Sequence, residues 1–255
     1  MTNNNEMQFA STINKKYLPG AKVFLKSLIT HNKNLNNTYN MLMFDDLNAE
    51  DKSCLTNIYK NINFISIQNT DYNYYNTSDE FRTWGFNCFN RFDIFTIKAK
   101  KLIFFDLDMV INQPLDYIFN INVDFASVLV NEKNRIDHPT KEFFDGGLMI
   151  ISEKYLNKKT KDKLIEISKT KKWSSDEPVL NLFFENKVYF LPKSFNVLSY
   201  EFFEHKNDYH ILQYVGANKP WMGNTIEECF DPHIIKNNTI VDLKKMLRIF
   251  KNYEY

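Results

Sequence analysis

The chain is poor in the residues that mark several common protein classes. Its 255 residues include three cysteines, at positions 54, 88 and 229, and six glycines. No CxxC pair is present, which excludes a zinc ribbon and argues against a disulfide framework. No glycine-rich fingerprint is present either, which argues against a dinucleotide or Walker-type phosphate site. The formal net charge is +1, so no overall field favours a nucleic-acid partner.

Long hydrophobic segments are also missing. No apolar run reaches the length of a membrane span, and the polar residues 1–6 lack the core of a signal peptide. The apolar fraction of 44% and the charged fraction of 25% are ordinary globular values. We therefore expect a globular, cytoplasmic protein without a transmembrane segment.

The most informative segment that is present is the apolar run 101–111, which is interrupted by Asp106 and Asp108. Apolar runs of this kind usually form strands buried on both faces. Burying an unpaired carboxylate inside such a strand costs on the order of several kcal/mol. We therefore expect the strand to end near Asp106. There both carboxylates can reach one hard cation outside the carboxyl edge of a sheet. A solvated turn is the alternative.

Apolar segments with strand character alternate with segments of helical period, which predicts a mostly parallel sheet with right-handed crossovers. Strands are expected at 7–12, 39–44, 63–67, 102–106, 125–130, 148–151, 188–191 and 211–215. Helices are expected at 19–30, 48–60, 81–97, 114–119, 153–169 and 176–184, with Ser174 or Ser175 capping the last. We expect one α/β domain with helices on both faces, made of a nucleotide-binding half (1–125) and a smaller, mixed acceptor-side half (126–255).

Two segments before the acidic pair suit a nucleotide. Residues 11–17 follow the first strand, where open α/β sheets bind nucleotides. There Asn14 can hydrogen-bond a base edge and Tyr17 can stack on it; a plain turn is the alternative. The guanidinium groups of Arg82 and Arg91 are suited to bind phosphate oxygens. The alternative is that they form surface ion pairs.

Three segments after the acidic pair are also distinctive. Gly146 and Gly147 lie between apolar runs, which indicates a close approach of a ligand, a special backbone angle or a bulge. Asp176 begins a helix, where an acid is favoured by the helix dipole or faces a reacting sugar. Residues 213–221 end a strand in a glycine turn, in which Lys219 meets a diphosphate or stays solvated.

Taken together, these segments resemble the glycogenin-like family 8 glycosyltransferases, in the same order along the chain. Residues 105–108 resemble the family's D-x-D metal motif, and 144–147 resemble F-N-x-G with Asp145 in place of Asn. Residues 176–181 resemble D-Q-x-x-L-N, and 215–221 resemble G-x-x-K-P-W. The resemblance implies a GT-A fold and retaining transfer of a hexose from a UDP-sugar, UDP-glucose first, to a glycan or protein hydroxyl.

The resemblance also implies site residues. It assigns the metal, Mn²⁺ or Mg²⁺, to Asp106, Asp108 and Gln213. It assigns catalysis to Asp145, Asp176 and Lys219. It assigns substrate binding to Ile13, Asn14, Tyr17, Arg82, Arg91, Leu107, Gly146, Glu177, Gly216 and Lys219.

One departure concerns the metal. The family places a histidine three residues before the glycine of G-x-x-K-P-W, and Gln213 stands there, with His210 on the opposite strand face. An amide oxygen binds hard cations but is a poorer ligand than imidazole for softer ions, so we expect weaker or less Mn²⁺-selective binding.

Alternatives to a transferase are a UDP-sugar-binding module with weak catalysis and a haloacid-dehalogenase-like phosphatase, whose motif is also D-x-D. Self-glycosylation, with Tyr200 as one tyrosine to consider, and a homodimer stay open.

Overall fold

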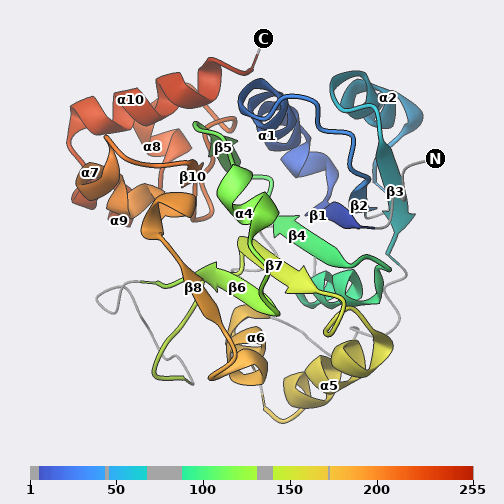
Figure 1. Ribbon diagram of the computed structural model, residues 1–255. Helices are drawn as coiled ribbons and strands as arrows, with labels where there is room; N and C mark the ends of the chain where they lie inside the picture. The colour runs from blue at the N-terminus through green and yellow to red at the C-terminus, as the bar shows by residue number, and fades with distance from the viewer. Residues whose placement is uncertain (1–5, 44–45, 68–87, 131–139, 172, 255) are drawn as a thin grey trace.

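The computed structural model describes residues 6–43, 46–67, 88–130, 140–171 and 173–254. A seven-stranded sheet with the order β3-β2-β1-β4-β7-β6-β8 forms its centre (Figure 1). A second, three-stranded sheet has the order β5-β10-β9. The strands of the large sheet are β1 (Met7–Ile13), β2 (Tyr39–Met43), β3 (Ile62–Ser66), β4 (Lys101–Phe105), β6 (Phe125–Val128), β7 (Leu148–Ser152) and β8 (Tyr189–Leu191). Those of the small sheet are β5 (Met109–Ile111), β9 (Val197–Leu198) and β10 (Ile211–Gln213).

The large sheet is mostly parallel, as expected. Strands β3, β2, β1 and β4 are parallel neighbours, and β6 is parallel to β8. Strand β7 runs antiparallel to both β4 and β6. It therefore brings its N-terminal end, with Gly147 just before it, next to the carboxyl end of β4.

Helices connect and cover the strands. The α-helices are α1 (Leu18–His31), α2 (Ala49–Ile58), α4 (Asp116–Asn120), α5 (Lys158–Ser168), α6 (Glu177–Phe184), α7 (Phe202–His205), α8 (Ile226–Cys229), α9 (Pro232–Asn237) and α10 (Ile240–Lys251). Shorter 3-10 helices cover Lys15–Tyr17, Cys88–Thr96, Lys193–Phe195 and Ser199–Glu201. The helix expected at 81–97 is thus a 3-10 helix over its described part. None of the described helices is long and apolar enough to cross a bilayer.

Helices cover both faces of the large sheet (Figure 1). Successive side chains of the central strands point to opposite faces and pack against these helices. Phe9 of β1 belongs to an apolar cluster with Phe24 of α1, on one face. Its neighbour Ala10 belongs to a cluster with Leu164 of α5 and Val179 of α6, on the other. Because both faces are covered, the central strands β4 and β7 are almost entirely apolar, and the α/β expectation is confirmed.

A third apolar cluster joins the small sheet to the C-terminal helices, with Leu212 of β10, Ile234 of α9 and Met246 of α10. The chain passes from the large to the small sheet at 106–108. The N–H of Asp106 donates to the carbonyl of Gly147 at 2.8 Å, in the large sheet's ladder. The carbonyl of Asp108 accepts from the N–H of Tyr214 at 2.8 Å, beside β10. The two aspartates are therefore anchored to different sheets.

Candidate active site

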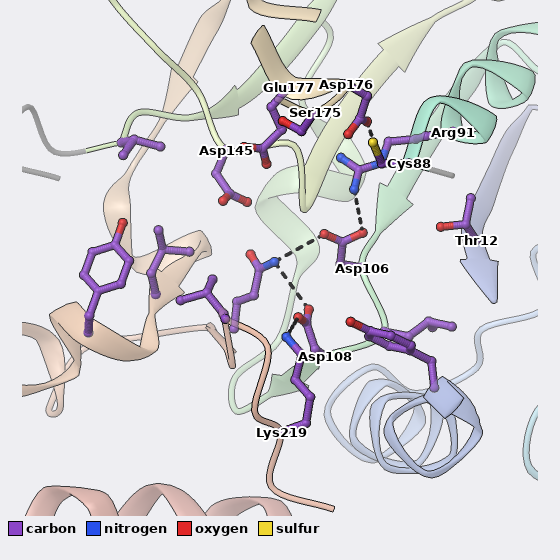
Figure 2. A pocket seen from close by; sticks show the side chains of 18 of the residues that line it. Thr12, Cys88, Arg91, Asp106, Asp108, Asp145, Ser175, Asp176, Glu177 and Lys219 are labelled. Carbon is purple, nitrogen blue, oxygen red and sulfur yellow. Dashed lines mark hydrogen bonds and ion pairs between the residues drawn. The ribbon is translucent and has the colours of Figure 1, made fainter. Parts of the chain in front are cut away.

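A pocket of about 330 Å³ lies where the chain leaves β1 and β4. Its lining comes from segments far apart in the sequence, and Figure 2 shows their side chains converging on it. The lining includes Thr12, Tyr17, Cys88, Arg91, Asp106, Leu107, Asp108, Asp145, Ser175, Asp176, Glu177, Tyr200, Gln213, Gly216 and Lys219. One cavity thus collects most of the site residues that the sequence singles out.

The acidic pair is bridged by Gln213. Its Nε2 lies 3.3 Å from Oδ2 of Asp106 and 3.3 Å from Oδ1 of Asp108 (Figure 2). Gln213 is the last residue of β10, which is antiparallel to β5 with Gln213 opposite Met109. This register brings its side chain to the acidic pair. His210 is turned away and its ring stacks on that of Phe195, with the centroids 4.3 Å apart.

Lys219 contacts the second aspartate. Its Nζ donates to Oδ2 of Asp108 and to the carbonyl of Tyr214, both at 2.6 Å, and the residue is 2% exposed. The turn before it needs a glycine, because Gly216 has a φ of +94°. Asp231 secures this turn by accepting from the N–H groups of Ala217 at 2.7 Å and Asn218 at 3.0 Å.

Arg91 serves the first aspartate. Its Nη2 lies 3.3 Å from Oδ1 of Asp106, its Nε lies 3.2 Å from Oδ2 of Asp176, and its guanidinium lies 5.0 Å from the centroid of the Phe104 ring. Burial raises the pKa of the Asp106 carboxyl to about 7, although Arg91 opposes that rise. Burial raises the pKa of Asp176 as well, again against Arg91. One cation is thus shared between two buried acids.

Two further carboxylates line the pocket. Oε1 of Glu177 accepts the N–H of Gly146 at 3.0 Å, and Oδ1 of Asp145 accepts the N–H of Gly147 at 2.7 Å. Burial raises the pKa of Glu177 to about 8, with the charge of Asp145 adding to the rise. Burial also raises the pKa of Asp145.

The two glycines allow this close packing of side chains. A Cβ on Gly146 would lie 2.3 Å from Nη1 of Arg91, and one on Gly147 would lie 2.5 Å from Oε1 of Gln213. Neither glycine has a positive φ among the described residues, so the special backbone angle is not the reason for them. Close approach is the reason, but the approaching groups belong to the chain itself.

Aromatic rings pack together at the Tyr17 end of the pocket. The ring of Tyr17 packs edge-on against Trp221, with the centroids 5.6 Å apart, and lies 5.9 Å from Nζ of Lys219. Asn14 caps the 3-10 helix that carries Tyr17, since its Oδ1 accepts the N–H of Tyr17 at 3.1 Å. Leu107 lines the pocket, whereas the side chain of Ile13 is buried in the apolar core and points away from it.

Some sequence expectations need correction. Neither Ser174 nor Ser175 caps α6: the N-cap is Asp176, and its side chain makes no capping hydrogen bond. Its carboxylate instead meets Arg91, and the thiol of Cys88 donates to it (Figure 2). Arg82 lies outside the described residues.

Sequence reasoning overlooked several residues that shape the pocket. Asn196 lies between Asp145 and Gln213, and Asp231 secures the turn before Lys219. Cys88 lines the pocket beside Asp176. No spacing or composition signal marks these residues, because each acts across a long sequence separation.

The donor atoms at the acidic pair suit a hard cation. Carboxylates from one or two residues, completed by waters and substrate phosphates, are the usual protein contribution to a Mg²⁺ site. Among the described residues no group of three or more His, Cys, Asp or Glu side chains is placed to hold a metal ion by itself. Asp106 and Asp108 therefore fit a cation that a phosphate-bearing substrate shares, rather than a closed structural site.

Solved structures share this fold. The galactosyltransferase LgtC, in an active-site mutant, superposes with a TM-score of 0.69 at 16% identity, over 94% of this chain and 96% of its own. GlyE from Streptococcus pneumoniae TIGR4 superposes with a TM-score of 0.67 at 16% identity, over 98% of this chain and 64% of its own. These matches confirm the GT-A fold.

Sequence comparisons agree. The curated glycosyltransferase GlyB of Streptococcus pneumoniae serotype 4 is 24% identical over 143 residues, 49% of this chain and 35% of GlyB, so the chain spans about a third of that relative. The model of the family described as "Glycosyl transferase family 8" matches residues 8–225. This match excludes the phosphatase alternative. The chain belongs to glycosyl transferase family 8.

Proposed function

We propose that the chain transfers a hexose from a UDP-sugar to a hydroxyl of a glycan or protein, with retention of anomeric configuration and with Mn²⁺ or Mg²⁺. UDP-glucose is the first donor to test. One observation carries the proposal: a single pocket holds the acidic pair, a buried lysine and three further carboxylates. Family 8 enzymes are in general retaining and metal-dependent, which supports both the stereochemistry and the cation.

The uridine is proposed to bind at the Tyr17 end of the pocket. Tyr17 offers a ring face for stacking, and Asn14 positions it through the cap described above. These residues belong to the half 1–125, which we propose as the nucleotide-binding half. The half 126–255 supplies Asp145, Glu177 and Lys219, so the sugar and the acceptor are proposed to lie against it.

The diphosphate is proposed to lie between the acidic pair and Lys219. Negative charge grows on this leaving group as the glycosidic bond breaks, and a fixed cation stabilises that charge. Lys219 is poised for this role, because Tyr214 and Asp108 hold its ammonium at the pocket wall. Gly216 gives the turn that lets the lysine reach there. A divalent cation on Asp106 and Asp108 would supply further electrostatic stabilisation when bound.

The hexose is proposed to lie among Asp145, Asp176 and Glu177. Carboxylates stabilise the positive charge of an oxocarbenium-like sugar centre. Arg91 favours the ionised form of Asp176 by direct contact, which suits it for that role. Asp145 and Glu177, whose pKa values are raised, are proposed to hydrogen-bond the sugar hydroxyls.

A hydrolysis screen tests the proposal. The purified chain is incubated with a panel of UDP-sugars and Mn²⁺ or Mg²⁺, and UDP release is measured, with the anomer of the product followed by NMR. We expect release from UDP-glucose or another UDP-hexose, with the α-anomer formed first from an α-donor. Asp106→Asn should abolish release, whereas Asp116→Asn, on the exposed first turn of α4, should not.

Two further measurements separate the alternatives. UDP binding by calorimetry without sugar release from any donor would show a binding module instead of a transferase. Intact mass after incubation would reveal self-glycosylation, for which Tyr200 is a candidate because it lines the pocket. A sizing column shows whether the chain forms a homodimer.

A further inference from the structure

Asn196 forms hydrogen bonds with two parts of the site at once. It follows the 3-10 helix Lys193–Phe195 and is fully buried, with 0% exposure. Its Nδ2 donates to Oδ1 of Asp145 at 2.9 Å and to Oε1 of Gln213 at 2.9 Å. These two contacts use both hydrogens of the Asn196 amide nitrogen.

The orientation of the Asn196 amide follows from its partners. Oδ1 of Asp145 already accepts the N–H of Gly147 at 2.7 Å, so a donor must face it. The amide nitrogen of Asn196 takes this place, and its second hydrogen then points at Gln213. Gln213 must present its oxygen to that hydrogen. Its own nitrogen therefore faces Asp106 and Asp108, where it is found at 3.3 Å from both.

Gly147 packs against the side-chain amide of Gln213 and the carboxylate of Asp145. A Cβ at Gly147 would lie 2.5 Å from Oε1 and 2.6 Å from Nε2 of Gln213, and 2.7 Å from Oδ1 of Asp145. The Gln213 amide is thus packed directly on the backbone. Rotation of this amide would break the contact with Asn196 and both contacts with the acidic pair.

We propose that Asn196 is a positioning residue that holds Gln213 as a hydrogen-bond donor to Asp106 and Asp108, and not as a third cation ligand. The inference rests on the proposed function in one respect, namely that the acidic pair takes a divalent cation. It replaces the sequence expectation for Gln213. The amide then contacts Oδ2 of Asp106 and Oδ1 of Asp108 only as a donor, and the cation draws its other ligands from water and the diphosphate.

Cation binding without a donor tests the proposal. Mn²⁺ is titrated into the protein alone and free Mn²⁺ is read by electron paramagnetic resonance, for wild type, Gln213→Ala, Asn196→Ala and the double variant. We expect wild type and Gln213→Ala to have the same affinity within about twofold, because the amide presents N–H groups to this site and these cannot ligate a cation. Asn196→Ala should bind Mn²⁺ more tightly, because the freed amide can turn its oxygen to the cation. The double variant should return to the affinity of Gln213→Ala.

Two outcomes would overturn the proposal. One is a loss of about tenfold or more in Gln213→Ala, which would show that the amide supplies its oxygen to the cation. The other is an Asn196→Ala protein that binds Mn²⁺ no more tightly than wild type. Asn120→Ala, at the exposed end of α4, is the matched control, and thermal melting confirms that each variant is folded.

A measurement without metal completes the test. The side-chain amide resonances of Gln213 are identified by their absence from the ¹H–¹⁵N spectrum of Gln213→Ala. They should move in Asn196→Ala, and unmoved resonances would contradict the proposal. Neither assay uses a donor sugar or turnover, so failure of the transferase assignment leaves both results interpretable.

Discussion

The two sides of the pocket differ in how many carboxylates each cation contacts. On the Arg91 side, one guanidinium contacts Asp106 and Asp176, and Glu177 lies nearby. On the Lys219 side, one ammonium contacts Asp108 and the carbonyl of Tyr214. The Arg91 side belongs to the large sheet and its helices, and the Lys219 side to the small sheet and the turn after it.

The difference lies in the ratio of acids to cations. Burial raises the pKa of Asp106 to about 7 and that of Glu177 to about 8, and the single guanidinium of Arg91 opposes this rise without cancelling it. The Lys219 side pairs one acid with one cation at 2.6 Å. We therefore expect protons to act mainly on the Arg91 side, and the leaving diphosphate mainly on the Lys219 side.

The largest expected effect is on stability, from Arg91→Ala. The substitution leaves Asp106 and Asp176 buried without their cation, and breaking a buried pair in this way costs about 3–5 kcal/mol. Urea denaturation should show this loss in the free energy of unfolding. Arg91→Lys keeps a charge but not the fork that reaches both acids, so its loss should be smaller. A loss below about 1 kcal/mol for Arg91→Ala, typical of an exposed pair, would contradict the account.

Lys219→Met tests the other side through catalysis. Removing a group that stabilises developing negative charge costs about 10²–10³ in kcat, or about 2.7–4 kcal/mol. UDP release from the donor found in the screen should fall by this factor, in protein shown to be folded by circular dichroism. Lys236→Met, on the exposed side of α9, is the control. A change confined to KM would show that Lys219 binds the donor without assisting the reaction.

Gly146 and Gly147 are neighbours in the chain but pack against different side chains of the pocket. Alanine at either position overfills a packed site, at a cost of about 1–3 kcal/mol. Gly146→Ala presses on Arg91 and Glu177, and Gly147→Ala presses on Gln213 and Asp145. Calorimetric melting should therefore show both variants to be less stable, with the pH dependence altered in Gly146→Ala and the Mn²⁺ affinity altered in Gly147→Ala. Identical behaviour of the two variants would remove the distinction.

The smallest expected effect is on the pH dependence of stability, from Glu177→Gln. The folded protein holds a proton on Glu177 up to about pH 8, whereas the unfolded chain loses it near its ordinary value of 4.5. Between these values the folded state binds more protons, so stability falls as pH rises from about 5 to about 8. The melting temperature of Glu177→Gln should fall less over this range. Glu185→Gln, just beyond α6, should match wild type.

Local patterns were enough to predict most elements of the first half. The helix expected from Asn48 is α2, because Asn48 and Asp51 form a reciprocal cap at 2.9 and 3.1 Å. The acidic pair comes directly after β4, as the interrupted apolar run indicates. The direction of β7 and the short strands β5 and β9 were not predicted, since pairing across the chain decides them. The two residues of β9 are too few for a periodic signal, and β5 continues the apolar run 101–111 that also contains β4.

Site residues were predicted where they belong to a sequence motif, and were missed where they do not. Lys219 and Gln213 were found from their distance to Gly216, and the structure brings both to the acidic pair. Asn196 was missed, because one asparagine in an asparagine-rich chain has no distinguishing spacing. Asp176 was expected at the helix start. Its side chain contacts Arg91 instead of capping the helix, and Arg91 lies 85 residues earlier in the chain.

The passage of the chain through Asp106, Leu107 and Asp108 has a mechanical consequence. Asp106 is tied to the ladder of the large sheet and Asp108 to the edge of the small one. Any ligand that contacts both carboxylates therefore holds the two sheets together where they meet. Its binding free energy also resists their separation, so the ligand should protect the backbone amides of β5 and β10 from hydrogen exchange as well as the residues it touches.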